Sequence, residues 1–299
     1  VHGMSPLLLL LCALLKPTLA SWEGETPDQA AAGPTKFFIL ATPRSGSTWL
    51  SLHLRNHGET AFHGNECWRS QDFVQFCASE WNKDAKVDPS MTLSHKLDAL
   101  FVPNTTSTEG LGKDFVGFKW MANQNFKNEL ELQEIMQYIN DNNVKVIALD
   151  RSNYLRKCFS FFDMEQRTRA GINAHHYAGS VKTATWDNKT HDIPANYLGH
   201  CLQWYEKLGK IMTRVLNSMK NPKNAILVKY EDMCGDTTGQ LAKIQSFLGL
   251  KETINPDTNI LKLHSAPVSE LVNNYDQLRP RLLAGRYGNV LARWEDHEC

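Results

Sequence analysis

The sequence predicts an α/β fold in which helices flank both faces of a parallel β-sheet and a P-loop-like turn follows the first strand. Three observations carry this prediction. Short apolar runs, typical of strands buried on both faces, alternate with longer segments of helical periodicity. A turn rich in glycine and serine joins the first apolar run to the first helical segment. Strands and helices that alternate in this way form βαβ units, whose crossovers are right-handed.

The expected elements follow one another along the chain. Apolar runs predict strands over residues 36–42, 115–121, 144–149 and 225–228. Helical periodicity predicts helices over residues 48–56, 128–142, 154–166, 196–219 and 240–248. Gly249 is placed to end the last of these helices as its C-terminal cap. In the second helix we expect an apolar stripe, with Leu130, Leu132, Ile135, Met136 and Ile139 on or near one face.

The ends of the chain predict its domain organisation. Residues 1–20 are expected to be a signal peptide, because an apolar run too short to span a bilayer precedes the small-residue pattern Thr18-Leu19-Ala20. A short uncleaved anchor or a plain apolar tail is the alternative. Residues 21–35, rich in glycine, alanine, proline and acidic residues, are typical of a linker. One domain is expected over residues 36–299, with a long polar loop at 171–194 as a lid or binding loop.

Composition and charge exclude several classes of protein. Lysine plus arginine number 32 and aspartate plus glutamate number 32, so the formal net charge of zero argues against a nucleic-acid coat or a polybasic membrane binder. No cysteine or histidine group has zinc spacing, and we expect no metal.

A location in the secretory pathway would allow the cysteines that follow the N-terminal apolar segment to form disulfides. There are six of them, namely Cys67, Cys77, Cys158, Cys201, Cys234 and Cys299, and an even number permits disulfides there. The triplets at Asn104 and Asn188 are acceptor sequences for N-glycosylation.

The turn after the first strand is the most specific motif. It reads Thr-Pro-Arg-Ser-Gly-Ser-Thr-Trp-Leu over residues 42–50. Gly46 permits a tight turn, so amides from Ser45 to Thr48 can point into one hollow at a helix start, where the helix dipole favours an anion. The hydroxyls of Ser47 and Thr48 add donors, and Arg44 adds a charged fork. The turn is therefore predicted to bind a phosphate group.

The same turn argues against a nucleotide triphosphatase or kinase. The phosphate-binding loop of those enzymes needs a lysine and a Ser/Thr directly after its second glycine, and the Ser/Thr hydroxyl binds magnesium. Here no lysine follows Gly46, and an arginine precedes it. A nucleotide kinase or GTPase is the less favoured alternative, and an ordinary strand–turn–helix connection is another.

A second junction supports a second phosphate site. Arg151 follows the strand expected at 144–149, where parallel strands deliver side chains to a ligand. Ser160 lies in the next helix, nine residues after Arg151, a spacing of about two and a half helical turns. Together these side chains would bind a second phosphate group.

On these motifs the chain resembles the sulfotransferase superfamily, which uses 3′-phosphoadenosine 5′-phosphosulfate (PAPS) as donor and releases 3′,5′-adenosine bisphosphate (PAP). Residues 42–50, Trp49 included, are similar to its 5′-phosphosulfate loop. Arg151 and Ser160 are similar to its 3′-phosphate site, with the spacing of the carbohydrate-type and trehalose-type branches. Weaker similarities lie at residues 117–121, 229–233, 247–250 and 269–276. The resemblance implies the sulfotransferase fold, spans about residues 36–291 and requires no metal.

The resemblance also implies a role for four further residues. Sulfonate moves in line to an acceptor hydroxyl that a general base deprotonates. Glu66 is the first candidate for the base, since carbohydrate-type relatives carry a similar Asn-Glu or Gly-Glu facing the acceptor. His63 is the alternative base, because histidine titrates near neutral pH. Lys119 would neutralise transferring charge, and Tyr230, in a Tyr-Glu context like that of the tyrosylprotein branch, would contact the donor.

The expected acceptor is a carbohydrate hydroxyl, and the expected compartment is the Golgi lumen or the outside of the cell. A small metabolite or a protein tyrosine is the alternative acceptor. Trp68, Trp81 and Trp186 fall in loop-like segments and would stack on a sugar face. A catalytically inactive binding protein on the same fold is a further alternative, against which the retained phosphate motifs argue.

Overall fold

The computed structural model describes residues 33–63, 66, 87–88, 90–101, 113–124, 129–171, 190–255, 266–289 and 291. The chain divides into two compact units, residues 1–33 and 34–299, and the fold described below belongs to the second. The expected signal segment, the glycosylation asparagines Asn104 and Asn188, Cys67, Cys77, Cys299 and the three loop tryptophans lie outside the described residues.

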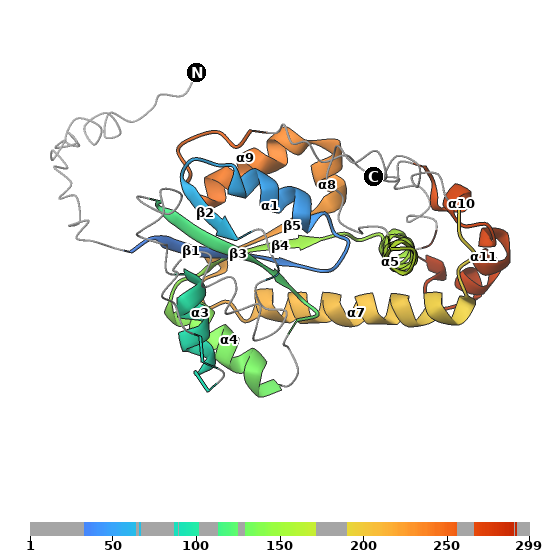
Figure 1. The fold of residues 1–299 in the computed structure, drawn as a ribbon, viewed down its shortest axis with the longest axis horizontal. Helices are drawn as coiled ribbons and strands as arrows, with labels where there is room; N and C mark the ends of the chain where they lie inside the picture. The colour runs from blue at the N-terminus through green and yellow to red at the C-terminus, as the bar shows by residue number, and fades with distance from the viewer. Residues whose placement is uncertain are drawn as a thin grey trace, which may run out of the picture. The chain divides into compact units, whose positions relative to one another are not determined.

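Five parallel strands form the sheet, in the order β2-β3-β1-β4-β5 (Figure 1). They are β1 (Thr35–Ala41), β2 (Thr60–His63), β3 (Phe115–Met121), β4 (Lys145–Asp150) and β5 (Ala225–Lys229). The connection after β1 leads toward β2 at one edge, and the connection after β4 leads to β5 at the other. The sheet therefore has its topological switch point between β1 and β4, and ligands of such sheets bind outside the carboxyl ends of the strands there.

Helices cover both faces of this sheet (Figure 1). The helices are α1 (Ser47–Arg55), α3 (Leu93–Phe101), α4 (Glu129–Asp141), α5 (Tyr154–Arg169), α7 (Ala195–Asn217), α8 (Tyr230–Gly235), α9 (Thr237–Leu248), α10 (Val268–Leu271) and α11 (Tyr275–Ala284), with a 3₁₀ turn at Pro222–Asn224. On one face α1, α8 and α9 pack over Phe37 and Ile39 of β1. On the other, α3, α4 and α7 pack over Phe38 and Leu40. This arrangement confirms the predicted fold class.

All four predicted strands and all five predicted helices are present, with ends displaced by up to three residues. Gly249 ends α9 with a φ of 89°, and its amide donates to the carbonyl of Gln245, so the predicted cap is confirmed. The prediction for Leu130 was wrong, because its side chain is 66% exposed. Leu130 precedes the buried Leu132 by two residues, which is about 200° around the helix, and so it points away from the core.

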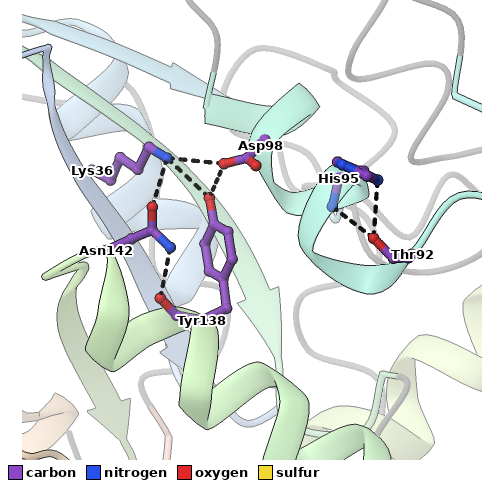
Figure 2. Close-up of polar contacts among 6 residues, drawn as sticks. All are labelled: Lys36, Thr92, His95, Asp98, Tyr138 and Asn142. Atoms are coloured by element: carbon purple, nitrogen blue, oxygen red, sulfur yellow. Dashed lines mark hydrogen bonds and ion pairs between the residues drawn. The ribbon is translucent and has the colours of Figure 1, made fainter.

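A polar cluster ties the amino end of β1 to α3 and α4 (Figure 2). The ammonium of Lys36 donates to Asp98 and to the hydroxyl of Tyr138, at 3.0 Å each, and lies 3.4 Å from Oδ1 of Asn142. Tyr138 in turn donates to Asp98 at 2.6 Å, and burial together with this carboxylate raises the pKa of Tyr138. This cluster lies at the end of the strand opposite to the predicted phosphate turn, and we assign it to the stability of the fold.

A disulfide between Cys158 and Cys201 joins α5 to α7. Cys234 is also disulfide-bonded. The bond between Cys158 and Cys201 joins residues that lie 43 positions apart in the sequence. The same bond fixes the position of α5, which carries Ser160 two residues after Cys158.

Replacing both bridged cysteines by serine is expected to lower the free energy of unfolding by about 2–4 kcal/mol, because the unfolded chain regains the entropy of the opened loop. Urea unfolding of Cys158→Ser/Cys201→Ser beside the parent protein measures this loss. The paired substitution is preferable to a reductant because a reductant would also attack the bond at Cys234. An unchanged unfolding midpoint would contradict the prediction.

Candidate active site

The phosphate turn lies at the carboxyl end of β1, beside the switch point. The Ser45 hydroxyl donates to the carbonyl of Thr42 at 2.7 Å and is buried, so it holds the turn closed. Arg44 has a φ of 62° and Gly46 a φ of 84°. A left-handed arginine is an uncommon conformation that costs free energy and is concentrated at functional sites. The backbone around Gly46 is thus bent as the sequence predicted, with an additional strained position at Arg44.

Helix α1 starts directly from this turn. Gly46 is its N-cap and, as a glycine, offers no side chain to cap the first amides. The exposed Thr48 lies in the first turn, where uncapped amides and the dipole favour an anion. The Ser47 hydroxyl donates instead to the sulfur of Met121 at 3.8 Å. The ring of Trp49 packs edge-on against that of His53, with 4.2 Å between the ring centroids. Thr48 is therefore the hydroxyl of this pair that is open to a ligand.

Arg44 joins the two predicted phosphate motifs. Its Nε donates to the hydroxyl of Ser160, in the second turn of α5, at 2.8 Å. Burial lowers the pKa of Arg44, and repulsion from the Arg151 guanidinium adds to this, while Tyr205 and Asp163 act in the opposite direction. Burial likewise lowers the pKa of Arg151 to about 10. Two guanidinium groups that are costly to keep charged are thus gathered at one place, where an anion with several oxygens would stabilise both.

Tyr230 completes this site from a third element. It is the first residue of α8 and directly follows Lys229, the last residue of β5. Its ring lies under Arg151, with 4.5 Å between the guanidinium carbon and the ring centroid. The same ring fills the space where Gly46 has no side chain, since a Cβ there would lie 2.5 Å from Cδ2 of Tyr230. Tyr230 therefore contacts both phosphate motifs.

Gly46→Ala is expected to destabilise the protein by about 1–3 kcal/mol and to weaken PAP binding. The added methyl group would force the Tyr230 ring away from the turn, in a backbone conformation that alanine adopts at a cost. Urea unfolding and calorimetric titration with PAP measure the two effects. Gly249→Ala is the matched control, because its φ of 89° is similar and a Cβ there meets nothing within 4 Å. Equal PAP affinity for both variants would contradict the assigned contact.

A buried lysine contacts the end of β4, next to the site, and it was not predicted from the sequence. Lys157 of α5 is fully buried and donates to Oδ1 of Asp150, at the end of β4, at 2.7 Å. The same oxygen accepts from the hydroxyl of Thr42 at 3.4 Å. Burial lowers the pKa of Lys157 to about 8, against the opposing effect of Asp150. Asp150 thus ties the ends of β1 and β4 to α5, and the tripeptide Asp-Arg-Ser at 150–152 was the available sequence signal.

Glu66 and Lys119 form a second cluster near the carboxyl ends of β2 and β3. Oε1 of Glu66 lies 3.9 Å from the ammonium of Lys119, and Oε2 accepts a hydrogen bond of 2.7 Å from Nε2 of Gln124. Burial lowers the pKa of Lys119, and Glu66 counteracts this. The Glu66 side chain is 40% exposed, so a ligand can reach its carboxylate. The two residues predicted to handle the transferred proton and charge are therefore neighbours.

His63, the alternative base, is the last residue of β2 and is buried. It pairs with Phe118, and it lies two residues after Ala61, which packs in the same core layer as Phe118. Since side chains alternate along a strand, His63 and Lys119 point to opposite faces of the sheet. The structure thus places Glu66, and not His63, beside Lys119.

The parts of the chain that the structure describes contain neither a candidate metal group nor a candidate membrane helix. Histidine, cysteine and acidic side chains form no group of three there that is placed to hold a metal ion. Among the described helices, none combines the length and the apolar character that crossing a bilayer requires.

Comparison with known proteins gives one family. The family model described as "Sulfotransferase domain" matches residues 34–277. Among solved structures, the chain is similar to a sulfotransferase from Alicyclobacillus acidocaldarius (14% identity, TM-score 0.45, covering 89% of this chain and 96% of that one). It is also similar to the mouse sulfotransferase SULT7A1 complexed with PAP (14% identity, TM-score 0.40, covering 88% and 89%). No curated protein matches the sequence. The family match contains all five strands, both phosphate motifs and Glu66.

Proposed function

The chain belongs to the sulfotransferase domain family, and we propose that it transfers a sulfonate group from PAPS to a hydroxyl group of a carbohydrate. The observation that supports this most directly is the 2.8 Å hydrogen bond between Arg44 and Ser160. It brings a turn suited to one phosphate group against a helix that, with Arg151, is suited to another. A donor with phosphate groups at both ends of one ribose requires such a pair of sites.

The residues present fit this donor. Arg44, Thr48 and the uncapped amides at the start of α1 would hold the 5′ end, and Arg151 with Ser160 would hold the 3′-phosphate. The half-buried Arg44 and the buried Arg151 supply the charge that a doubly phosphorylated nucleotide needs. When bound, PAPS supplies the sulfonate group and leaves as PAP.

The chain's own residues would then act on charge and on one proton. Arg44 would stabilise the negative charge that develops on the leaving phosphate. Glu66 would accept the proton of the attacking hydroxyl, with its exposed carboxylate as the general base. Lys119, whose ammonium lies 3.9 Å from Oε1 of Glu66, would add positive charge beside the transferred group.

The carbohydrate acceptor and the compartment belong to the same proposal. The carbohydrate is supported by the resemblance of the Arg151–Ser160 spacing and of the Asn-Glu pair at 65–66 to carbohydrate-type sulfotransferases. A secretory location, in the Golgi lumen or outside the cell, is supported by the disulfide between Cys158 and Cys201, since such bonds persist in oxidising compartments.

An acceptor panel tests the proposal. The protein is incubated with labelled PAPS and, separately, with oligosaccharides, tyrosine-containing peptides and small phenols, and the label on each acceptor is counted. We expect transfer to an oligosaccharide hydroxyl. Transfer to peptide tyrosine or phenols alone would contradict the carbohydrate acceptor and identify the labelled class as the acceptor. PAP binding without transfer to any acceptor would indicate an inactive binding protein.

A further inference from the structure

The carboxamide of Gln124 lies between the turn after β3 and the carboxylate of Glu66. Its side chain is only 5% exposed, although it lies in a loop. Its Nε2 donates to Oε2 of Glu66 at 2.7 Å, and its Oε1 accepts from the backbone amide of Met121 at 3.3 Å. Sequence reasoning had no signal for this residue, because a glutamine three residues after a strand is unremarkable by itself.

The contacts of Gln124 fix which end of its amide faces Glu66. The amide of Met121 is a donor, so the atom that meets it must be the carboxamide oxygen. The nitrogen is thereby turned toward Glu66. The backbone of Gln124 is held as well, since its N–H donates to the carbonyl of Met121 at 2.8 Å and its carbonyl accepts from the Trp120 indole at 3.4 Å. The donor is therefore presented to the carboxylate from a fixed position.

This contact distinguishes the two oxygens of Glu66. Oε2 is taken by Gln124, whereas Oε1 lies 3.9 Å from the Lys119 ammonium, which is too long for a hydrogen bond. Among the described residues, Oε1 therefore keeps its lone pairs for another donor. A carboxylate on a long, 40% exposed side chain has several rotamers, and a hydrogen bond of 2.7 Å to a buried partner selects one of them.

We propose that Gln124 is a positioning residue for the transfer reaction, holding Oε2 of Glu66 so that Oε1 faces the acceptor hydroxyl. This inference rests on the proposed function, in which Glu66 is the base. Gln124 touches neither donor nor acceptor in this role. It acts through the geometry of the carboxylate, where a displacement of about 1 Å can cost roughly 10²-fold in rate.

Two substitutions separate positioning from a structural role. Gln124→Glu keeps an oxygen for the amide of Met121 but removes the donor to Glu66, whereas Gln124→Met removes both contacts. Gln133→Glu is the matched control, because Gln133 also donates to a glutamate, Glu129, at 3.3 Å, but on the exposed surface of α4. The parent enzyme, the three variants and Glu66→Gln are compared in kcat, acceptor KM and calorimetric PAP affinity.

We expect both Gln124 variants to lose about 10- to 100-fold in kcat, with PAP affinity and the Gln133→Glu control unchanged. Adding Gln124→Glu to Glu66→Gln should cause no further loss, because residues that act as a unit are not additive. A normal kcat for Gln124→Glu, or the same fold-loss in the Glu66→Gln background, would overturn the positioning role alone. A normal kcat for Glu66→Gln would overturn both this role and the proposed base.

Discussion

Replacing Glu66 by glutamine is expected to lower kcat by about 10²- to 10⁴-fold, which is the usual contribution of a general base. The amide keeps the size of the side chain but cannot accept the proton of the acceptor hydroxyl. PAP affinity should be unchanged, because the phosphate motifs around Arg44 and Arg151 do not include Glu66. Steady-state kinetics with PAPS and calorimetry with PAP measure the two quantities separately.

Glu129→Gln is the control for this substitution. Glu129 is a surface glutamate that pairs with Arg214, and its replacement should leave kcat unchanged. His63→Asn tests the alternative base. Full activity in Glu66→Gln together with a large loss in His63→Asn would show that His63 is the base and that the pairing of Glu66 with Lys119 is structural.

Replacing Arg44 by alanine is expected to lower kcat/KM for PAPS by about 10²- to 10³-fold, the cost of removing one group that stabilises developing negative charge. Both binding and kcat should fall, since Arg44 would hold the donor phosphate and its charge on leaving. Arg44→Lys should recover only part of the loss. Lysine keeps the positive charge but has neither the planar fork nor the Nε that donates to Ser160 at 2.8 Å.

The comparison of alanine and lysine controls for the strained backbone at position 44. Both substitutes must adopt the left-handed conformation with a φ of 62°, so a difference between them reports the side chain. Arg214→Ala, which removes an exposed, ion-paired arginine of α7, should leave the kinetics unchanged. Equal activity of the alanine and lysine variants would contradict a role for the charge of Arg44.

Sequence reasoning succeeded where the signal was local. Continuous apolar runs mark strands buried on both faces, and the turn at 42–50 combines a left-handed glycine with a helix start, so both were predicted. The short strand β2 was not predicted, because residues 60–63 show neither alternation nor a long apolar run. Its burial comes from pairing with β3 and from α1 over it.

The parts of the site that depend on distant contacts were beyond sequence reasoning. Lys157 and Asp150 could not be paired from their spacing alone, because their contact depends on how α5 packs on β4. Gln124 acquires its role only because residues 66 and 124 meet across the edge of the sheet. The contact of Tyr230 with Gly46 likewise joins residues far apart in the sequence, from α8 and the phosphate turn. Local motifs thus predicted the candidate phosphate-binding residues, which the structure brings together, whereas tertiary packing determines which neighbours contact them.

The double phosphate site is the central claim, and the binding of PAP compared with 5′-AMP and magnesium-ATP tests it most directly. Calorimetry on the parent protein and on Arg151→Ala, at one salt concentration, gives the affinities. We expect PAP to bind the parent at least roughly 30-fold more tightly than 5′-AMP, equivalent to about 2 kcal/mol for one buried charge contact, and this preference to disappear in the variant. Equal binding of PAP and 5′-AMP by the parent, or tighter binding of magnesium-ATP, would contradict it.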